Sequence, residues 1–283
     1  SGDTAGYINF IENLDGGDPP QWAAPAHLTV KNQIIRIQAG PNGSVQGPAE
    51  AKWGYTVLNA ADWDRDGLPD LIVNSIWGEV LWFRNAGTRT APALDEAQRI
   101  TVAWDGPAPK PAWNWWNPNG NQLVTEWRTS PVVFDWDGNG TLDLIMLDQE
   151  GYLAFFSAPE GNGAPILAAP QRIFLDTTGA PLRLNPGEGG KSGRRKFCIA
   201  DWDGDGRNDI LIDSKCADFL RNVSDADGKT TFKNMGTVDT RVLAGHDTCP
   251  TVVDWDKNGI PDLVIGAEDG FFYYLKKIGR AHV

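Results

Sequence analysis

The sequence predicts an all-β protein, organised as a β-propeller of four-stranded antiparallel blades. Three observations favour it: an acidic strip that recurs four times, short apolar stretches on both sides of each strip, and 32 glycines with 19 prolines as punctuation. Short β-branched and aromatic runs bounded by Gly and Asp are typical of strands joined by tight turns. Units of this kind repeated along one chain are typical of propellers.

The repeated strip reads DWDRDGLPD, DWDGNGTLD, DWDGDGRND and DWDKNGIPD, and it begins at residues 62, 135, 201 and 254. One apolar stretch precedes each strip, and a second and a third follow it. A less regular fourth stretch is visible in QRITVAW and QRIFLD, so each repeat predicts four strands. A small residue stands at a constant distance after each strip, before the third stretch: Gly78, Gly151, Ala217 and Gly270.

We expect a single β-propeller domain over residues 1–283, with repeats around 51–105, 125–176, 191–242 and 245–283 and a partial repeat around 1–50. The opening GDTAGYINFIENL aligns with GAEDGFFYYLKK of the last repeat, which indicates a start in the middle of a repeat. The stretch HLTVKNQIIRI could then supply the outer strand of the last blade. Four blades with a spare strand, five with one incomplete, and a fragment of a larger ring all fit this pattern.

Composition limits the function classes. The 41% hydrophobic content suffices for a sizeable core in one large or two small domains. A formal net charge of −12 disfavours nucleic acid as a partner. No apolar run approaches the ~18 residues of a membrane span, and no signal peptide is present. The oligomeric state is left open.

The three cysteines match no metal-binding spacing. Cys198 lies in the apolar stretch KFCIADWD and is expected to be a buried thiol. Cys216 and Cys249 lie near predicted strand ends, so both a disulfide and two free thiols fit the sequence.

The alternating carboxylates of each strip predict a calcium site. Side chains at alternate positions converge because the glycine permits a tight turn, and calcium takes about six to eight oxygen ligands. We expect about four structural calcium ions, although an acidic turn without metal is the alternative. The seventh residue should give a backbone carbonyl: Leu68, Thr141, Arg207 and Ile260. The expected side-chain ligands are Asp62, Asp64, Asp66, Asp70, Asp135, Asp137, Asn139, Asp143, Asp201, Asp203, Asp205, Asp209, Asp254, Asp256, Asn258 and Asp262.

A tryptophan holds the second place of every strip and points to the opposite side of the strand. An aromatic residue at one place in every repeat is most simply explained by packing between blades. These four residues are Trp63, Trp136, Trp202 and Trp255.

The strips resemble those of the FG-GAP or VCBS-repeat β-propellers, a group that includes integrin α-subunit heads and several bacterial polysaccharide-active proteins. The resemblance covers the four repeats, and hence most of the chain. It implies a calcium-binding propeller in a secreted, periplasmic or cell-surface protein. Rhamnogalacturonan-lyase-type propellers have similar calcium strips, but propellers host many unrelated functions, so activity must be argued from the site.

The loops that precede the strips vary between repeats and are the predicted binding site, because inner strands line the channel of a propeller. Basic side chains there suit the carboxylates of an acidic polysaccharide or oligosaccharide, and aromatic faces suit sugar rings. The catalytic candidates are His246 as general base, Tyr55 as proton donor, and Arg128 and Arg194 as neutralising cations. The substrate-binding candidates are Lys52, Trp53, Trp113, Trp115, Trp116, Trp127, Lys191 and Arg195.

Three functions fit these residues. The first is a carbohydrate-active enzyme, of polysaccharide lyase or glycoside hydrolase type. The second is a non-catalytic, lectin-like or adhesive propeller that binds a carbohydrate or a protein, and the third is a purely structural domain. For each candidate there is also a plainer interpretation: solvated or ion-paired basic residues, tryptophans packed beneath loops, and a hydrogen-bonded loop histidine.

Overall fold

The computed structural model describes residues 1–17, 20–110, 117–160, 166–187, 193–224, 229–245 and 248–277. In these ranges the chain is all-β apart from the one-turn 3-10 helix η1 (Pro48–Glu50), which confirms the predicted class. No helix in the described ranges has the length and apolar character needed to cross a membrane. The chain divides into two compact units, one formed by Ser1–Gln171 with Asn185–Gly193 and the other by Arg172–Leu184 with Arg194–Val283.

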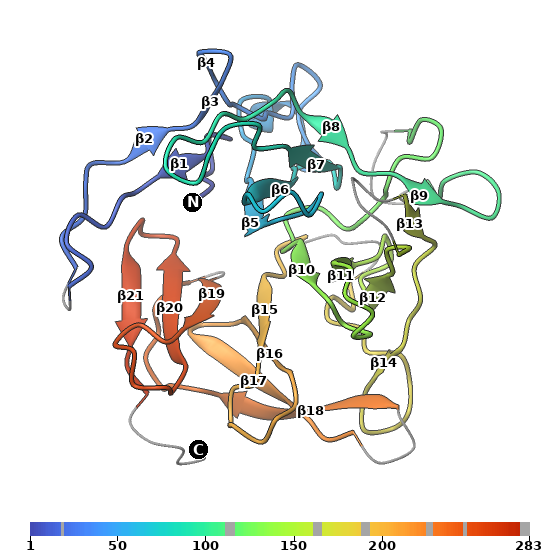
Figure 1. Cartoon of the computed structure of the whole chain (residues 1–283). Coiled ribbons are helices and arrows are strands. Elements are labelled where there is room, and N and C mark those ends of the chain that lie inside the picture. The colour runs from blue at the N-terminus through green and yellow to red at the C-terminus, as the bar shows by residue number, and fades with distance from the viewer. Residues whose placement is uncertain are drawn as a thin grey trace. The chain divides into compact units, whose positions relative to one another are not determined.

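The first repeat folds into an antiparallel sheet of four consecutive strands (Figure 1). They are β5 (Val57–Ala61), β6 (Asp70–Asn74), β7 (Val80–Phe83) and β8 (Gln98–Arg99). The acidic strip forms the turn between the first two, since the last residue of β5 pairs with the first residue of β6. The predicted four-stranded unit is therefore present in this repeat.

The second repeat has the same order but fewer strands. Its antiparallel sheet consists of β10 (Val132–Phe134), β11 (Asp143–Leu147) and β12 (Leu153–Phe156). β9 (Val102–Ala103) and β13 (Leu167–Ala168) pair with each other in parallel. Within the described ranges, the fourth stretch, QRIFLD, reaches this sheet only through a bridge between residues 155 and 171.

The N-terminal segment forms two small antiparallel pairs. β1 (Asn9–Phe10) pairs with β2 (Ala26–His27), and β3 (Thr29–Val30) pairs with β4 (Gln33–Ile34). The segment packs on the first repeat, because its buried side chains share one core cluster with those of β6 and β7. That cluster contains Ile8, Ile35, Val73 and Phe83.

In the second unit, the third repeat forms a five-stranded sheet. Its strands, in spatial order, are β14 (Phe174–Leu175), β18 (Thr230–Thr237), β17 (Ala217–Asn222), β16 (Asp209–Asp213) and β15 (Phe197–Ala200). β14 runs parallel to β18, and its buried Phe174 packs on Phe232 with ring centroids 6.2 Å apart. The end of QRIFLD, predicted as a fourth strand of the second repeat, therefore joins the third repeat's sheet.

The fourth repeat forms an antiparallel sheet of β19 (Thr248–Val253), β20 (Asp262–Ala267) and β21 (Phe272–Leu275).

All three cysteines are free thiols, so the disulfide that the sequence left open is not formed. Cys198 is half-buried against the cluster that contains Leu211, and desolvation raises the pKa of its thiol to about 12, so the thiol stays protonated at neutral pH.

The tryptophans of the strips lie mainly in the cores. Trp63 is buried in a cluster that includes Ile72 of the first repeat and Leu144 of the second, so it packs between the two sheets as predicted. Trp202 packs in the same way on the cluster that contains Leu211 and Leu263 in the second unit. Trp136 and Trp255 are half-buried against an aromatic neighbour from their own repeat.

Candidate metal centres and the preceding loops

All four acidic strips form the same turn. The backbone N–H of the sixth residue donates to Oδ2 of the first aspartate at 2.9–3.0 Å in every strip. That sixth residue has a φ between 81° and 90°, a region that favours glycine. The glycine therefore lets the chain close around the carboxylate of the first aspartate. These glycines are Gly67, Gly140, Gly206 and Gly259.

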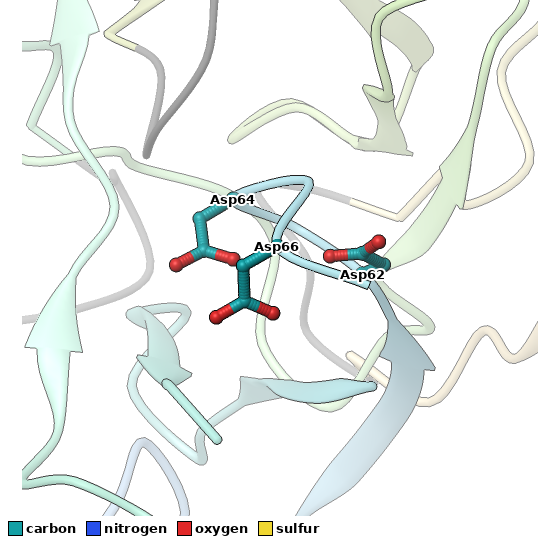
Figure 2. A group of neighbouring side chains, drawn as sticks. All are labelled: Asp62, Asp64 and Asp66. Atoms are coloured by element: carbon teal, nitrogen blue, oxygen red, sulfur yellow. The ribbon is translucent and has the colours of Figure 1, made fainter. Parts of the chain in front are cut away.

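The fifth side chain also serves the turn. Its Oδ1 accepts the backbone N–H of the seventh residue at 2.7–3.0 Å in all four strips. Only in the first strip does the fifth residue belong to the close group of carboxylates, formed by Asp62, Asp64 and Asp66 (Figure 2). In the other strips the group consists of the first, third and ninth residues: Asp135, Asp137 and Asp143; Asp201, Asp203 and Asp209; Asp254, Asp256 and Asp262.

The ninth aspartate has a structural function that the sequence did not reveal. Its carboxylate is fully buried in every strip. Oδ2 accepts the backbone N–H of the second-place tryptophan at 3.0–3.2 Å. Oδ1 accepts a backbone N–H at the end of the third strand at 2.7–2.9 Å. The side chain thus ties the strip to the third strand, in Asp70, Asp143, Asp209 and Asp262 alike.

Burial also changes the acidity of these carboxyls. Desolvation is the main cause that raises the pKa of Asp70 and Asp143 above the ordinary value, and it raises the pKa of Asp209 to about 6. Neighbouring aspartates of the same strip add to the rise, while the backbone N–H groups oppose it. These three strips therefore gather negative charge at a place where water solvates it poorly.

The donor sets fit a hard cation. In each group, three carboxylate oxygens lie within 4.8 Å of one another. Oδ1 of Asp62, of Asp64 and of Asp135 is buried without a hydrogen-bond partner in the described structure, and the Asp64 side chain is only 8% exposed. Buried oxygens without donors are costly, and like charges this close repel. A calcium ion has the all-oxygen preference that such a group would satisfy.

In the first unit, the loops before the strips bring three candidates together. The Arg128 guanidinium lies over the Tyr55 ring, with its carbon 3.4 Å from the ring centroid, and over the Trp127 ring at 4.1 Å. Arg128 is only 1% exposed, and its Nη2 donates to Oε2 of Glu50 at 2.9 Å. Ser44 donates to the same Glu50 oxygen. Glu50 was not among the sequence candidates, because nothing local connects it to a residue so far along the chain.

Trp127 is held equally deeply. Its side chain is fully buried and packs with Ile76 and Trp77. A Cβ added to Gly193 would lie 2.3 Å from the Trp127 ring, so only glycine fits at that position. Trp127 and Arg128 therefore act here as packing and charge-pairing residues. Both side chains are buried in the described structure, so they offer no exposed surface for the substrate contact that the sequence predicted.

Two other candidates of this loop are exposed. Trp53 is 41% exposed, and its ring meets the Tyr55 ring edge to face, with centroids 5.4 Å apart. Lys52 is exposed beside it. The backbone of Trp53 is fixed, since its N–H donates to Glu50 and its carbonyl accepts the N–H of Ala39, both at 2.9 Å. The loop therefore presents an aromatic face and a cation from a rigid backbone.

Arg194 and Arg195 belong to the second unit and are half-buried. Arg195 donates to the backbone carbonyl of Asp213 at 3.2 Å and forms an ion pair with its carboxylate at 3.4 Å. Burial raises the pKa of Asp213 to about 6, although the charges of Arg195 and Lys196 oppose the rise. The gathering of Arg194, Arg195 and the first-unit candidates into one pocket stays a prediction. Trp113, Trp115, Trp116, Lys191 and His246 lie outside the described residues.

Comparison with known proteins gives few matches. No family model matches the chain, and no curated protein matches it. Among solved structures, the chain is similar to an Agrocybe aegerita lectin studied for its specific recognition of non-reducing terminal N-acetylglucosamine. The two are 18% identical with a TM-score of 0.40, over 96% of this chain and 63% of that one. The chain thus spans less than two thirds of the length of that lectin.

Proposed function

We propose that this chain is a calcium-stabilised β-propeller of the FG-GAP/VCBS-repeat type that binds an acidic carbohydrate, in a secreted, periplasmic or cell-surface protein. The observation that carries the proposal is the fourfold recurrence of one antiparallel unit whose first turn gathers three carboxylates within 4.8 Å. Propellers arrange such units radially around a channel. A metal ion in each turn would replace the solvation that the buried carboxylates lack.

Calcium would be held by the close carboxylate groups of each strip, and it would supply positive charge that fixes the turn between the first two strands. The chain itself positions these groups. The first aspartate is oriented by the N–H of the sixth residue, and the ninth by two backbone N–H groups. The backbone of the strips therefore holds these oxygens close together. In this proposal calcium stabilises the fold and takes no part in ligand chemistry.

The carbohydrate part of the proposal is supported by the exposed pair Lys52 and Trp53. A tryptophan face packs on the apolar side of a sugar ring, as amphipathic aromatic side chains do at interfaces. The ammonium of Lys52 suits the carboxylate of a uronate. Tyr55 braces the Trp53 ring from the side, and Arg128 in turn stacks on Tyr55. The buried arginine is thus a support for the binding loop in this proposal.

Calorimetric titration with uronate oligosaccharides and with neutral oligosaccharides tests this site. We expect binding of the uronate ligand, at least about tenfold weaker binding by Trp53→Ala, and a loss of the preference for acidic sugar in Lys52→Ala. Trp22→Ala is the matched control, because Trp22 is a similarly exposed tryptophan, at 49%, in the N-terminal segment of the same unit. Wild-type affinity in Trp53→Ala would refute the assignment of the site.

Incubation of the protein with the same uronate oligosaccharides decides whether the carbohydrate is also cleaved. β-Elimination in a uronate chain produces an unsaturated product that absorbs in the ultraviolet. A rise in absorbance that is lost in His246→Ala would make the protein a lyase with that histidine as its base. Binding without any rise would leave it a binding module.

A further inference from the structure

One residue near the end of the third strand distinguishes the four strips from one another. It immediately precedes the residue whose backbone N–H donates to the ninth aspartate, so it occupies the same place in every repeat. At this place three repeats carry a basic side chain and one carries a hydroxyl: Arg84, Ser157, Arg221 and Lys276.

In each of those three repeats, the basic side chain is paired with the aspartate at the third position of the strip, which is called the third aspartate below. In the first, Arg84 Nε lies 2.5 Å from Oδ2 of Asp64, and Nη2 lies 2.8 Å from Oδ2 of Asp66. The guanidinium thus bridges two of the three carboxylates in the close group. A positive charge of the chain itself therefore already compensates this strip in part.

The third and fourth strips repeat the arrangement. Arg221 Nε lies 2.6 Å from Oδ2 of Asp203, and Nη2 lies 3.2 Å from Oδ2 of Asp205. In the fourth strip, Lys276 Nζ lies 2.6 Å from Oδ2 of Asp256. Three of the four repeats thus place a cation on the aspartate at the third position of the strip.

The second strip has no such compensation from the described residues. Its matched residue is Ser157, and within the described part of the chain no lysine or arginine forms an ion pair with Asp135, Asp137 or Asp143. Among the described residues, Asp137 accepts only the backbone N–H and the side-chain amide of Asn139, both at 3.1 Å. Oδ1 of Asp135 is buried and has no hydrogen-bond partner in the part of the chain that the structure describes. This strip keeps the most uncompensated negative charge.

We propose that the four strips are unequal calcium sites: the second binds calcium most tightly, and the basic side chain on the third aspartate weakens the other three. The physical reason is repulsion, because an incoming divalent cation meets a positive charge held within a few ångströms on one of its own ligands. This inference rests on the proposed binding of calcium, and it divides the expected ions between one tight site and three weaker ones.

Calorimetric titration of the calcium-free protein with calcium tests the ranking. The wild type should show one tight site and a weaker class. Arg84→Ser gives the first strip the residue found in the second, so the number of tight sites should rise from one to two. Ser157→Arg makes the reverse change, and the tight site should weaken by at least about tenfold.

The matched control is Arg99→Ser. It removes the same charge from the same sheet, but Arg99 pairs with Glu79 at 3.1 Å, away from any strip. This variant should keep one tight site. Thermal unfolding of each variant verifies that it is folded, and Lys276→Ser provides a second conversion should Arg84→Ser fail to fold.

The outcomes separate the two proposals. Four equal sites in the wild type, or an equal gain of a tight site in Arg84→Ser and Arg99→Ser, would overturn the ranking while leaving calcium binding intact. No calcium binding at all in the wild type would overturn the calcium proposal, and the ranking with it.

Discussion

The acidic strips and the loops that precede them are neighbours along the chain, yet they handle charge in opposite ways. A strip brings three carboxylates within 4.8 Å of one another. The loops instead pair opposite charges, as in Arg128 with Glu50 and Arg195 with Asp213. Three strips also pair one or two of their carboxylates with a basic side chain, but more carboxylates than cations gather there, so negative charge is left for a cation from outside. The opposite charges of the loops are matched one to one and need none. The stability of the strips should therefore depend on calcium and that of the loops should not.

The largest effect is expected at the buried pair in the first unit. Glu50→Gln removes a carboxylate that faces the buried Arg128 guanidinium, and breaking a buried pair on one side costs about 3 kcal/mol or more. The free energy of unfolding should fall by this amount equally with calcium and with chelator, as measured by urea denaturation.

Two further variants sharpen this test. Glu50→Gln combined with Arg128→Met should recover part of the loss, because the variant then has no unpaired charge to bury. Glu96→Gln breaks an exposed pair with Lys31 and should leave the denaturation midpoint nearly unchanged. A loss in Glu50→Gln that appears only in chelator would contradict this, because the stability of the loops would then depend on the calcium sites of the strips.

The second unit offers a test by pH. Asp213 has a folded-state pKa of about 6 against an ordinary 3.8, because it is buried. The folded protein thus holds this proton more tightly than the unfolded chain does. The resulting stabilisation is complete below about pH 4 and is lost as the pH rises to about 6, by about 3 kcal/mol at ~1.4 kcal/mol per pKa unit.

Asp213→Asn keeps the shape but does not titrate. Relative to the wild type, the variant should gain stability from pH 4 to pH 7 in calcium-saturated buffer, as followed by urea denaturation at each pH. Taking the difference between the two proteins removes the titration of the strips, which both share. A constant difference across this range would mean that Arg195 and Lys196 hold the pKa of Asp213 near its ordinary value.

Removal of calcium should act on the strips alone. A ligand that binds only the folded state stabilises it by about 2.7 kcal/mol at a hundredfold excess over its dissociation constant. Chelation should therefore lower the melting temperature of the wild type, and by less in Ser157→Arg, whose tightest site is already weakened. Equal melting temperatures with calcium and with chelator would remove the role assigned to the metal.

The two regions also differ in how far the sequence predicts them. The turn of each strip is local. In the first strip, for example, the backbone N–H of Gly67 donates to Asp62, only five residues earlier. Spacing alone therefore predicts both the turn and the strands around it. The oxygens that gather in the group depend on longer contacts. Asp143 binds the backbone N–H of Ala158, which no local pattern indicates. The sequence therefore assigned the ninth aspartate only as a ligand and missed its structural function.

The loops were predicted less well for the same reason. Tyr55 and Arg128 each stand seven residues before the first aspartate of their strip, and their side chains do come together. Yet basic residues in a variable loop indicated an exposed surface, and Arg128 is buried because Glu50, 78 residues away, provides its counter-charge. A partner so distant in sequence has no periodic signal. Burial of a charge depends on such a partner, so composition alone does not predict it.

The smallest expected effect concerns the backbone that all strips share. The fourth residue has a positive φ in each strip, from 58° in Lys257 to 76° in Gly204. Glycine adopts this conformation freely, whereas any residue with a Cβ is strained there. Gly138→Ala should therefore cost about 1 kcal/mol, with nothing within 4 Å for the new Cβ to clash with. Lys257→Ala at the equivalent place should change almost nothing, because both side chains carry a Cβ. Urea denaturation in saturating calcium and again in chelator measures both, and the difference between the two variants should be the same in each. Equal losses in the two variants would show that the positive φ is not what requires glycine in the second strip. A difference between the variants that is seen only with calcium would assign the cost to the metal site and not to the turn.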